Sequence, residues 1–236
     1  MWYKIGEMKI ISWICLLFIS LTVEAASPVK ALLERIDKGA SNKFIIEQVG
    51  SDIEFFELDQ KGDKVVIRGN NPVSIATGLN WYLKYYAGIH LSWNGMQAKL
   101  PENLPAVSHK ERHETNMKYR YDFNYCTYSY SMAFWDWKRW EEEIDWMALH
   151  GINLPLAMVG TDGVWFKKLG YKKEEINEFI AGPGFQGWWL MNNLEGWGGP
   201  NPDSWYKQQI ALQQRIVKRM REYGIKPVFP GYSGMV

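Results

Sequence analysis

Amide, indole, thioether and thiol side chains gather in segments that follow predicted strands, and these side-chain types suit the binding of a sugar. The residues are Asn124, Tyr125 and Cys126 after the first strand, Thr161 and Asp162 after the second, and Trp188, Trp189, Met191, Asn192 and Asn193 in the loop before a long helix. An asparagine amide both donates and accepts hydrogen bonds with hydroxyl groups, and an indole offers an apolar face for a sugar ring. Taken alone, each of these segments is a weak signal.

Other chemistries find less support in the residues. Cys126 would need a nearby base to act as a nucleophile, and none of the four histidines lies in a strand-end loop, so a small buried hydrophobic residue is the alternative interpretation. The histidines also lack the spacing of metal ligands with Cys126 or with each other. We therefore expect no zinc site, and no Walker loop, GxGxxG or GxSxG motif is present.

The stretch "SMAFWDWKRWEEEIDWMALHGINLPLAMVG" combines tryptophans with a run of acids on one predicted helix, residues 135–150. A helical stripe facing a sheet is predicted for Trp137, Trp140, Ile144, Met147 and Ala148, which recur at intervals of three and four. On the other side stand Glu141, Glu142 and Asp145. We interpret these acids as a solvated face rather than as catalytic groups, since chemistry in a β/α barrel sits at strand ends.

Composition narrows the class of protein. The 236 residues are 47% hydrophobic and 22% charged, the balance of a packed globular protein. A net charge of +1 gives no reason to expect a nucleic-acid partner. Aromatic residues reach 15%, with 13 Trp and 13 Tyr, which suits sugar recognition, although the same rings could simply fill a core.

The first 25 residues have the features of a signal peptide. Met8-Lys9 precedes an uncharged apolar run from Ile10 to Val23, and "VEAAS" offers small residues for cleavage after Ala25. We therefore expect an exported protein, periplasmic or secreted, that is not membrane-bound after cleavage; a retained anchor is the alternative. Cleavage would leave Cys126 as the single thiol, so no internal disulfide is expected.

Residues 26–104 indicate a small N-terminal α/β domain. A short helix ("PVKALLERI"), three strands ("KFIIEQV", "IEFFEL", "KVVIRG") and an amphipathic helix starting at Asn71-Pro72 are predicted in that order. The Pro-bearing polar segment "LPENLPAVSHKERHE" that follows is typical of a linker, which we place at residues 105–116.

From residue 117 the order changes to strand, helix, strand, helix, strand, which predicts parallel strands with crossover helices. "KYRYDFNYCTYSYS" is interpreted as a strand running into a loop, "INLPLAMVG" as a buried strand, residues 204–223 as a long helix and "KPVFPGY" as a strand. About three β/α units fit into residues 117–236, whereas a TIM-type (β/α)8 barrel takes about 250 residues, so we expect an incomplete barrel. Pro155 lies within the second strand, where it removes one hydrogen-bond donor. We therefore expect either a bulge at this position or a strand that lacks a partner on one side.

Several long motifs resemble one family. "YRYDFNYCTYSYS" followed by "WDWKRWEEEIDWMALHGIN", then "EINEFIAGPGFQGWWLMNNLEGWGGP" and "PVFPGYSG", are similar to the first part of the catalytic barrel of the alpha-N-acetylglucosaminidases, glycoside hydrolase family 89. "VVIRGNNPVSIATGLNWYLKYYAGIHLSW" is similar to that family's N-terminal domain. The resemblance implies an exo-acting, retaining hydrolase without a cofactor, whose partner is a glycan that ends in alpha-linked N-acetylglucosamine.

The resemblance also implies site residues. The family's pocket residues map onto Asn124, Cys126, Trp188 and Met191, while both catalytic glutamates map beyond Val236. We therefore expect a portion of such an enzyme that carries part of the sugar pocket and no catalytic residue. The alternatives are a vestigial or free-standing carbohydrate-binding protein without turnover, and an exported scaffold whose aromatic residues only pack. The oligomeric state and the natural glycan stay open.

Overall fold

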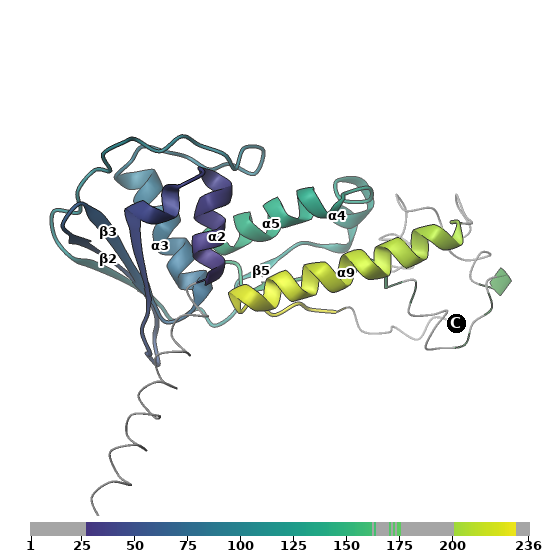
Figure 1. The fold of residues 1–236 in the computed structure, drawn as a ribbon. Helices are drawn as coiled ribbons and strands as arrows, with labels where there is room; N and C mark the ends of the chain where they lie inside the picture. The colour runs from purple at the N-terminus through teal and green to yellow at the C-terminus, as the bar shows by residue number, and fades with distance from the viewer. Residues whose placement is uncertain are drawn as a thin grey trace, which may run out of the picture. The chain divides into compact units, whose positions relative to one another are not determined.

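The computed structural model describes residues 27–161, 163, 170, 172, 174–175 and 201–229 (Figure 1). The chain forms two compact units: the first holds the described residues up to Lys118 with Ala148–Gly151 and Glu222–Gly224, and the second holds the rest. The predicted signal peptide, Asp162, Trp188 and Met191 lie outside the described residues, and export therefore stays a prediction.

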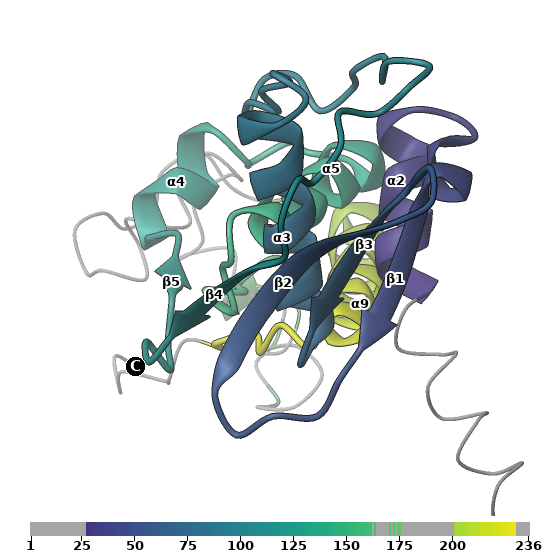
Figure 2. The same ribbon diagram turned by 90° about the vertical axis from the view of Figure 1, so that its left-hand side faces the viewer.

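The first unit is built on a four-stranded sheet of order β1-β3-β2-β4. Its elements are α2 (Ser27–Ile36), the 3-10 helix η1 (Ala40–Lys43), β1 (Phe44–Gln48), β2 (Glu54–Lys61), β3 (Lys64–Gly69), α3 (Pro72–Tyr85) and β4 (Glu111–Thr115). β1 runs parallel to β3, while β2 is antiparallel to both β3 and β4. Figure 2 shows α2 and α3 on one face of this sheet, so the predicted small α/β domain is what these residues form.

The sequence explains why α3 begins where it does and how closely it packs. The Asn71 side chain accepts a hydrogen bond from Ser74 N (2.8 Å), and Pro72 opens the first turn, where its missing N–H costs nothing. Gly78 faces the sheet, where an added Cβ would lie 3.0 Å from Ile67 Cγ2. The helix therefore approaches the strands more closely than any larger residue would allow.

The predicted linker is partly wrong, because Glu111–Thr115 forms the edge strand β4. Its sequence, ERHET, is wholly polar and carries no hydrophobic alternation. Ion pairs help to hold this strand in place of an apolar face. The buried Glu57 on β2 binds Lys110 Nζ (2.9 Å) and Arg112 Nη1 (3.3 Å). A strand held by backbone bonds and ion pairs is invisible to a search for apolar periodicity.

The second unit contains the predicted parallel strands and crossover helices. Its elements are β5 (Tyr121–Asp122), α4 (Tyr125–Tyr130), α5 (Trp137–Leu149), β6 (Leu154–Pro155) and α9 (Asp203–Tyr223). β5 and β6 pair in parallel, and Leu156 forms a further parallel bridge with Val228. This partial, barrel-like sheet is the α/β arrangement that the sequence predicts.

Pro155 lies in a strand with a neighbour on each side, so a missing neighbour is the wrong explanation for it. Leu156 N donates to Asp122 O of β5 (3.0 Å), and Val228 N donates to Pro155 O on the other side (2.9 Å). Because proline has no N–H, the hydrogen-bond ladder between this strand and the segment around Val228 lacks one donor at Pro155. The neighbouring Asn153 N and Leu154 N both donate to Arg120 O (3.2 Å each), which shows a local irregularity in the β5 ladder.

The solvated face predicted for α5 is partly wrong, because Asp145 is buried while Glu141 and Glu142 stay partly exposed. Asp145 is buried and lies 4.0 Å from Arg219 Nη1 of α9, and Arg219 Nη2 binds Glu141 Oε1 at 2.8 Å. Glu143 is buried as well and pairs with Arg139 Nη2 at 2.9 Å. Of the predicted apolar stripe, Trp140, Ile144, Met147 and Ala148 are buried, whereas Trp137 is half-buried under Arg215 of α9. α5 is thus covered on more than one side.

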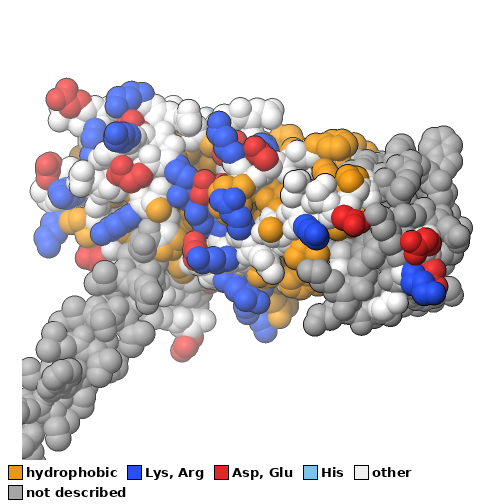
Figure 3. All heavy atoms as spheres, turned by 45° about the vertical axis from the view of Figure 1, so that its right-hand side comes forward, with side chains coloured by type: hydrophobic (Ala, Val, Ile, Leu, Met, Phe, Trp, Pro, Cys, Tyr) orange, Lys and Arg blue, Asp and Glu red, His pale blue; other side chains and the backbone are white. Residues whose placement is uncertain are grey.

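The surface carries charges of both signs. On the face drawn in Figure 3, positive and negative side chains are interspersed and hydrophobic side chains reach the surface between them. In the part of the chain that the structure describes, no helix combines the length and apolarity that crossing a membrane requires.

Candidate functional site

Asn124 stands at the C-terminal end of β5, where it begins α4. Its Oδ1 accepts hydrogen bonds from Thr127 N (2.9 Å) and Thr127 Oγ1 (2.8 Å), and its own backbone N donates to Thr127 Oγ1 (3.4 Å). This reciprocal arrangement is a capping box. The segment predicted as a loop is therefore a short helix, and the residue that starts it is one of the predicted sugar-binding residues.

The cap leaves the other half of the Asn124 amide available. The residue is exposed, and its Nδ2 makes no hydrogen bond within the described residues. Because Oδ1 is held by Thr127, the direction of the Nδ2–H donors is fixed rather than free to rotate. A donor pair held in this way at a strand end can bind a hydroxyl or carbonyl oxygen of a ligand.

Phe123 precedes this donor in a conformation that L-residues rarely adopt. Its φ of 71° lies in the left-handed region, where it is alone among the described residues other than glycine. Phe123 N donates to Asp122 Oδ1 (2.8 Å), and its ring meets Tyr128 and Trp140 edge-on, with centroids 5.7 and 6.1 Å away. Strain of this kind persists where the surroundings enforce it, often at functional sites.

Tyr128 anchors α4 to the sheet beneath the site. Its side chain is 6% exposed, its hydroxyl donates to Leu156 O in β6's continuation, and its ring lies 5.8 Å from Trp140. Burial raises the pKa of Tyr128 well above its usual value, so the hydroxyl keeps its proton and stays a donor. The strand end is thus held from below by a packed aromatic cluster.

Asp122 brings a half-buried carboxyl to the same strand end. Burial raises its pKa above the ordinary value, and the hydrogen bond from Phe123 N opposes this shift only in part. The folded protein therefore holds the Asp122 proton more tightly than the unfolded chain does. Protonated Asp122 therefore stabilises the folded protein at low pH. This stabilisation is lost as the pH rises from the ordinary carboxyl pKa through the raised pKa of Asp122 in the folded protein.

We expect Asp122→Asn to raise the unfolding temperature at pH 7 and to leave it nearly unchanged at about pH 3, where the carboxyl is protonated in both states. The asparagine oxygen can still accept from Phe123 N, so the change removes the charge alone. Thermal unfolding of both proteins between these two pH values measures the effect.

Asp59→Asn is the matched control, because the hydrogen bond from Arg68 lowers the pKa of Asp59 and gives the opposite sign. This variant should lose stability at pH 7, with the loss shrinking as pH falls. A benefit of Asp122→Asn that grows toward low pH would contradict the assignment.

Cys126 is half-buried in α4 and is not part of a disulfide within the described residues. One turn later, Tyr130 is 64% exposed, and partial desolvation followed by the neighbouring Cys126 thiol raises the pKa of the tyrosine. Cys126 is therefore neither a fully buried hydrophobic residue nor an isolated one: it lies beside an exposed phenol on the helix that Asn124 begins.

Of the other residues that the sequence suggested for the site, the structure describes only some. Trp188, Met191 and Asp162 lie outside the described residues. Thr161 is half-buried, and its Oγ1 donates to Met158 O (2.8 Å) in the turn after β6. The described ranges contain no group of three or more His, Cys, Asp or Glu side chains that could hold a metal ion.

The structure adds residues to the site that the sequence did not single out. Asp122, Phe123 and Tyr128 fix the strand end from which Asn124 projects. The Asn-x-x-Thr spacing of Asn124 and Thr127 is a capping signal that would have predicted α4. No comparable signal marks the left-handed conformation of Phe123, because phenylalanine is not a residue that favours it.

Known proteins resemble this chain along almost its whole length. Two family models match it: the alpha-N-acetylglucosaminidase (NAGLU) N-terminal domain over residues 27–106, and the alpha-N-acetylglucosaminidase (NAGLU) tim-barrel domain over residues 120–236. Human alpha-N-acetylglucosaminidase is 47% identical over 176 residues, which are 73% of this chain and 24% of the human protein.

Solved structures agree. A family 89 glycoside hydrolase from Clostridium perfringens, in complex with 2-acetamido-1,2-dideoxynojirmycin, matches with a TM-score of 0.85 and 40% identity over 91% of this chain and 25% of that one. A variant of the Clostridium perfringens enzyme in complex with GlcNAc-alpha-1,4-galactose matches with a TM-score of 0.85 and 40% identity, covering 90% of this chain and 25% of that one. The chain thus spans about a quarter of the length of these relatives.

Proposed function

The chain belongs to the alpha-N-acetylglucosaminidase family, glycoside hydrolase family 89, and on this premise we propose that it binds glycans ending in alpha-linked N-acetylglucosamine through the strand end at Asn124. The solved relative in complex with GlcNAc-alpha-1,4-galactose supports this choice of ligand. In β/α barrels, ligands bind at the C-terminal ends of the strands, which is where Asn124 lies.

The observation that carries the proposal is the fixed, exposed amide of Asn124. Its oxygen is engaged by Thr127 and its Nδ2 donors face outward, so they can reach an acceptor on a sugar without reorganising the helix. Cys126 and Tyr130 on the next turn of α4 continue this surface. Trp188 and Met191 are proposed as further sugar-binding residues, on the family resemblance alone.

Hydrolysis with retention needs two carboxyl groups about 5 to 5.5 Å apart, one as acid/base and one as nucleophile. The acids of α5 do not fit this role, because Arg139 and Arg219 engage Glu143, Glu141 and Asp145 on the helix. Asp122 lies at the strand end, but its Oδ1 accepts from Phe123 N. We propose that this chain supplies binding and that its own acids do not cleave the glycosidic bond.

Asn124→Asp tests the binding role. The aspartate keeps an oxygen to cap α4 but replaces the Nδ2 donors with an acceptor, so we expect the affinity for N-acetylglucosamine to fall about tenfold while the helix stays capped. Titrations followed by ligand-observed NMR measure the affinity, and far-UV circular dichroism checks the fold. The same samples should show no release of an aryl alcohol from an aryl alpha-N-acetylglucosaminide.

Asn71→Asp is the matched control, because Asn71 of the first unit caps α3 through its Oδ1, which accepts from Ser74 N. It should leave the affinity unchanged. Equal affinities for the wild-type chain and Asn124→Asp would contradict the proposed site, and turnover abolished by a Glu→Gln change within α5 would contradict the proposed division between binding and cleavage.

A further inference from the structure

We propose that Phe134 and Trp205 form a stacking site for the second sugar of the glycan, the ring on the leaving-group side of the terminal N-acetylglucosamine. This inference rests on the proposed function and extends it from a terminal sugar to a disaccharide. The two rings meet edge-to-face, with centroids 6.0 Å apart and planes at 65°. They come from segments about 70 residues apart in sequence.

Topology places both residues on the side of the sheet where Asn124 lies. Phe134 precedes α5 by three residues, and Trp205 is the third residue of α9. In parallel β/α units, a crossover helix runs opposite to the strands, so its first turn lies beside the strands' C-terminal ends. Phe134 and Trp205 therefore belong to the same edge of the second unit as the candidate site.

The loop that carries Phe134 is held firmly on both sides. Met132 is 4% exposed and accepts a backbone hydrogen bond from Trp135 N (3.1 Å). Trp135 packs against Trp140 with centroids 5.3 Å apart. Asp136 then caps α5, since its Oδ1 accepts from Arg139 N (3.0 Å).

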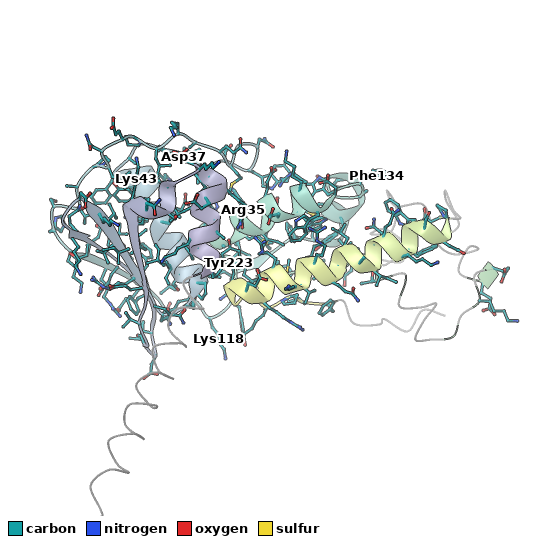
Figure 4. All side chains as sticks on the ribbon, in the orientation of Figure 1. Arg35, Asp37, Lys43, Lys118, Phe134 and Tyr223 are labelled. Carbon is teal, nitrogen blue, oxygen red and sulfur yellow. The ribbon has the colours of Figure 1, made fainter. Side chains whose placement is uncertain are left out.

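Phe134 projects from this anchored loop into solvent, with 75% of its surface exposed (Figure 4). Burial of this ring against a ligand would be favourable, and the free protein leaves that contact unused. Trp205 is half-buried beside it. An aromatic residue that is exposed yet rigidly held is pre-organised to stack on a ligand.

Asn124 and Phe134 are close in sequence, at the two ends of one short segment. α4 separates them, and its six residues extend about 9 Å along the helix axis. Tyr130, which is 64% exposed, ends that helix and lies four residues before Phe134. A glycan that extends from Asn124 along this edge would meet this second aromatic surface. The apolar C–H face of a pyranose is the chemical partner that such a surface fits.

The test compares N-acetylglucosamine with GlcNAc-alpha-1,4-galactose as ligands of the whole 236-residue chain. We expect the disaccharide to bind about tenfold more tightly, and saturation-transfer NMR to show transfer from the protein to the galactose ring. Phe134→Ala should reduce disaccharide affinity to that of the monosaccharide and leave monosaccharide affinity unchanged. Phe134→Trp should retain the preference, and Trp205→Ala should lose it independently.

Tyr85→Ala is the control, because Tyr85 is 57% exposed but lies on α3 of the first unit. It should change neither affinity. Equal binding of the two sugars by the wild type, or a preference that survives both Phe134→Ala and Trp205→Ala, would overturn the stacking site while leaving the proposed function intact. Absence of binding by either sugar would instead overturn the proposed function.

Discussion

Replacing Trp140 with alanine is expected to lower the free energy of unfolding by about 3 to 5 kcal/mol, the usual cost of emptying a buried aromatic site. Trp140 is 1% exposed, and its ring contacts Tyr128, Phe123 and Trp135 at centroid distances of 5.8, 6.1 and 5.3 Å. The cavity would open directly beneath the strand end that carries Asn124. Urea unfolding followed by far-UV circular dichroism measures the loss without relying on the missing indole.

Trp137→Ala is the matched control, one turn away on the same helix. Trp137 is half-buried, and Arg215 lies over its ring at 4.3 Å, so the change removes a surface contact worth about 1 kcal/mol. Comparable losses at the two positions would mean that the aromatic cluster around Trp140 does not hold the second unit together.

Gly160→Ala is expected to cost about 2 to 5 kcal/mol through two additive causes, a left-handed backbone and a steric clash. Gly160 has a φ of 68°, and an added Cβ would lie 2.8 Å from the backbone C and O of Gln209 in α9. Backbone atoms in a helix cannot move aside as a flexible side chain would. The free energy of unfolding in urea should fall accordingly.

Gly224→Ala separates the two causes. Gly224 follows α9 with a φ of 78°, and nothing lies within 4 Å of the position where its Cβ would be. Only the left-handed penalty of about 1 to 2 kcal/mol applies there. If both alanine variants lost the same stability, the close approach of the turn after β6 to α9 would have no energetic weight.

The long described helices α3, α5 and α9 are predictable from sequence, whereas the short helix α4 was predicted as a loop. α3 and α9 begin and end close to their predicted bounds, and Asn71-Pro72 marks the start of α3 by a known capping pattern. The strand β6 is equally clear from the apolar run INLPLAMV. The strand β4 is not, since its five residues are polar: Arg112 pairs with Glu57 of β2, and His113 stacks on Phe56 of the same strand.

The burial of acidic side chains on α5 could not be predicted from the spacing of residues along the helix. Charged residues opposite an apolar stripe normally face water. Here the charged side meets arginines, so Asp145 is 3% and Glu143 0% exposed. Arg219, which engages Glu141 and lies near Asp145, is some 75 residues further along the chain, and nothing in the helix itself signals that such a partner exists.

The sequence suggests where the candidate site lies but not its geometry. Asn124 follows a predicted strand, and its position and its amide side chain made it a candidate. That the oxygen of this exposed residue caps α4 depends on Thr127 and on the left-handed backbone of Phe123. Tertiary packing of Phe123 against Tyr128 and Trp140 enforces that conformation, and local propensity opposes it.

The most direct test of sugar binding at the strand end is a map of backbone amide chemical shifts, recorded as N-acetylglucosamine is added to the chain. We expect the largest changes at residues 122–130, with smaller ones near Phe134. Changes confined to the first unit, or no change at saturating sugar, would contradict the assignment of the site to Asn124 and α4.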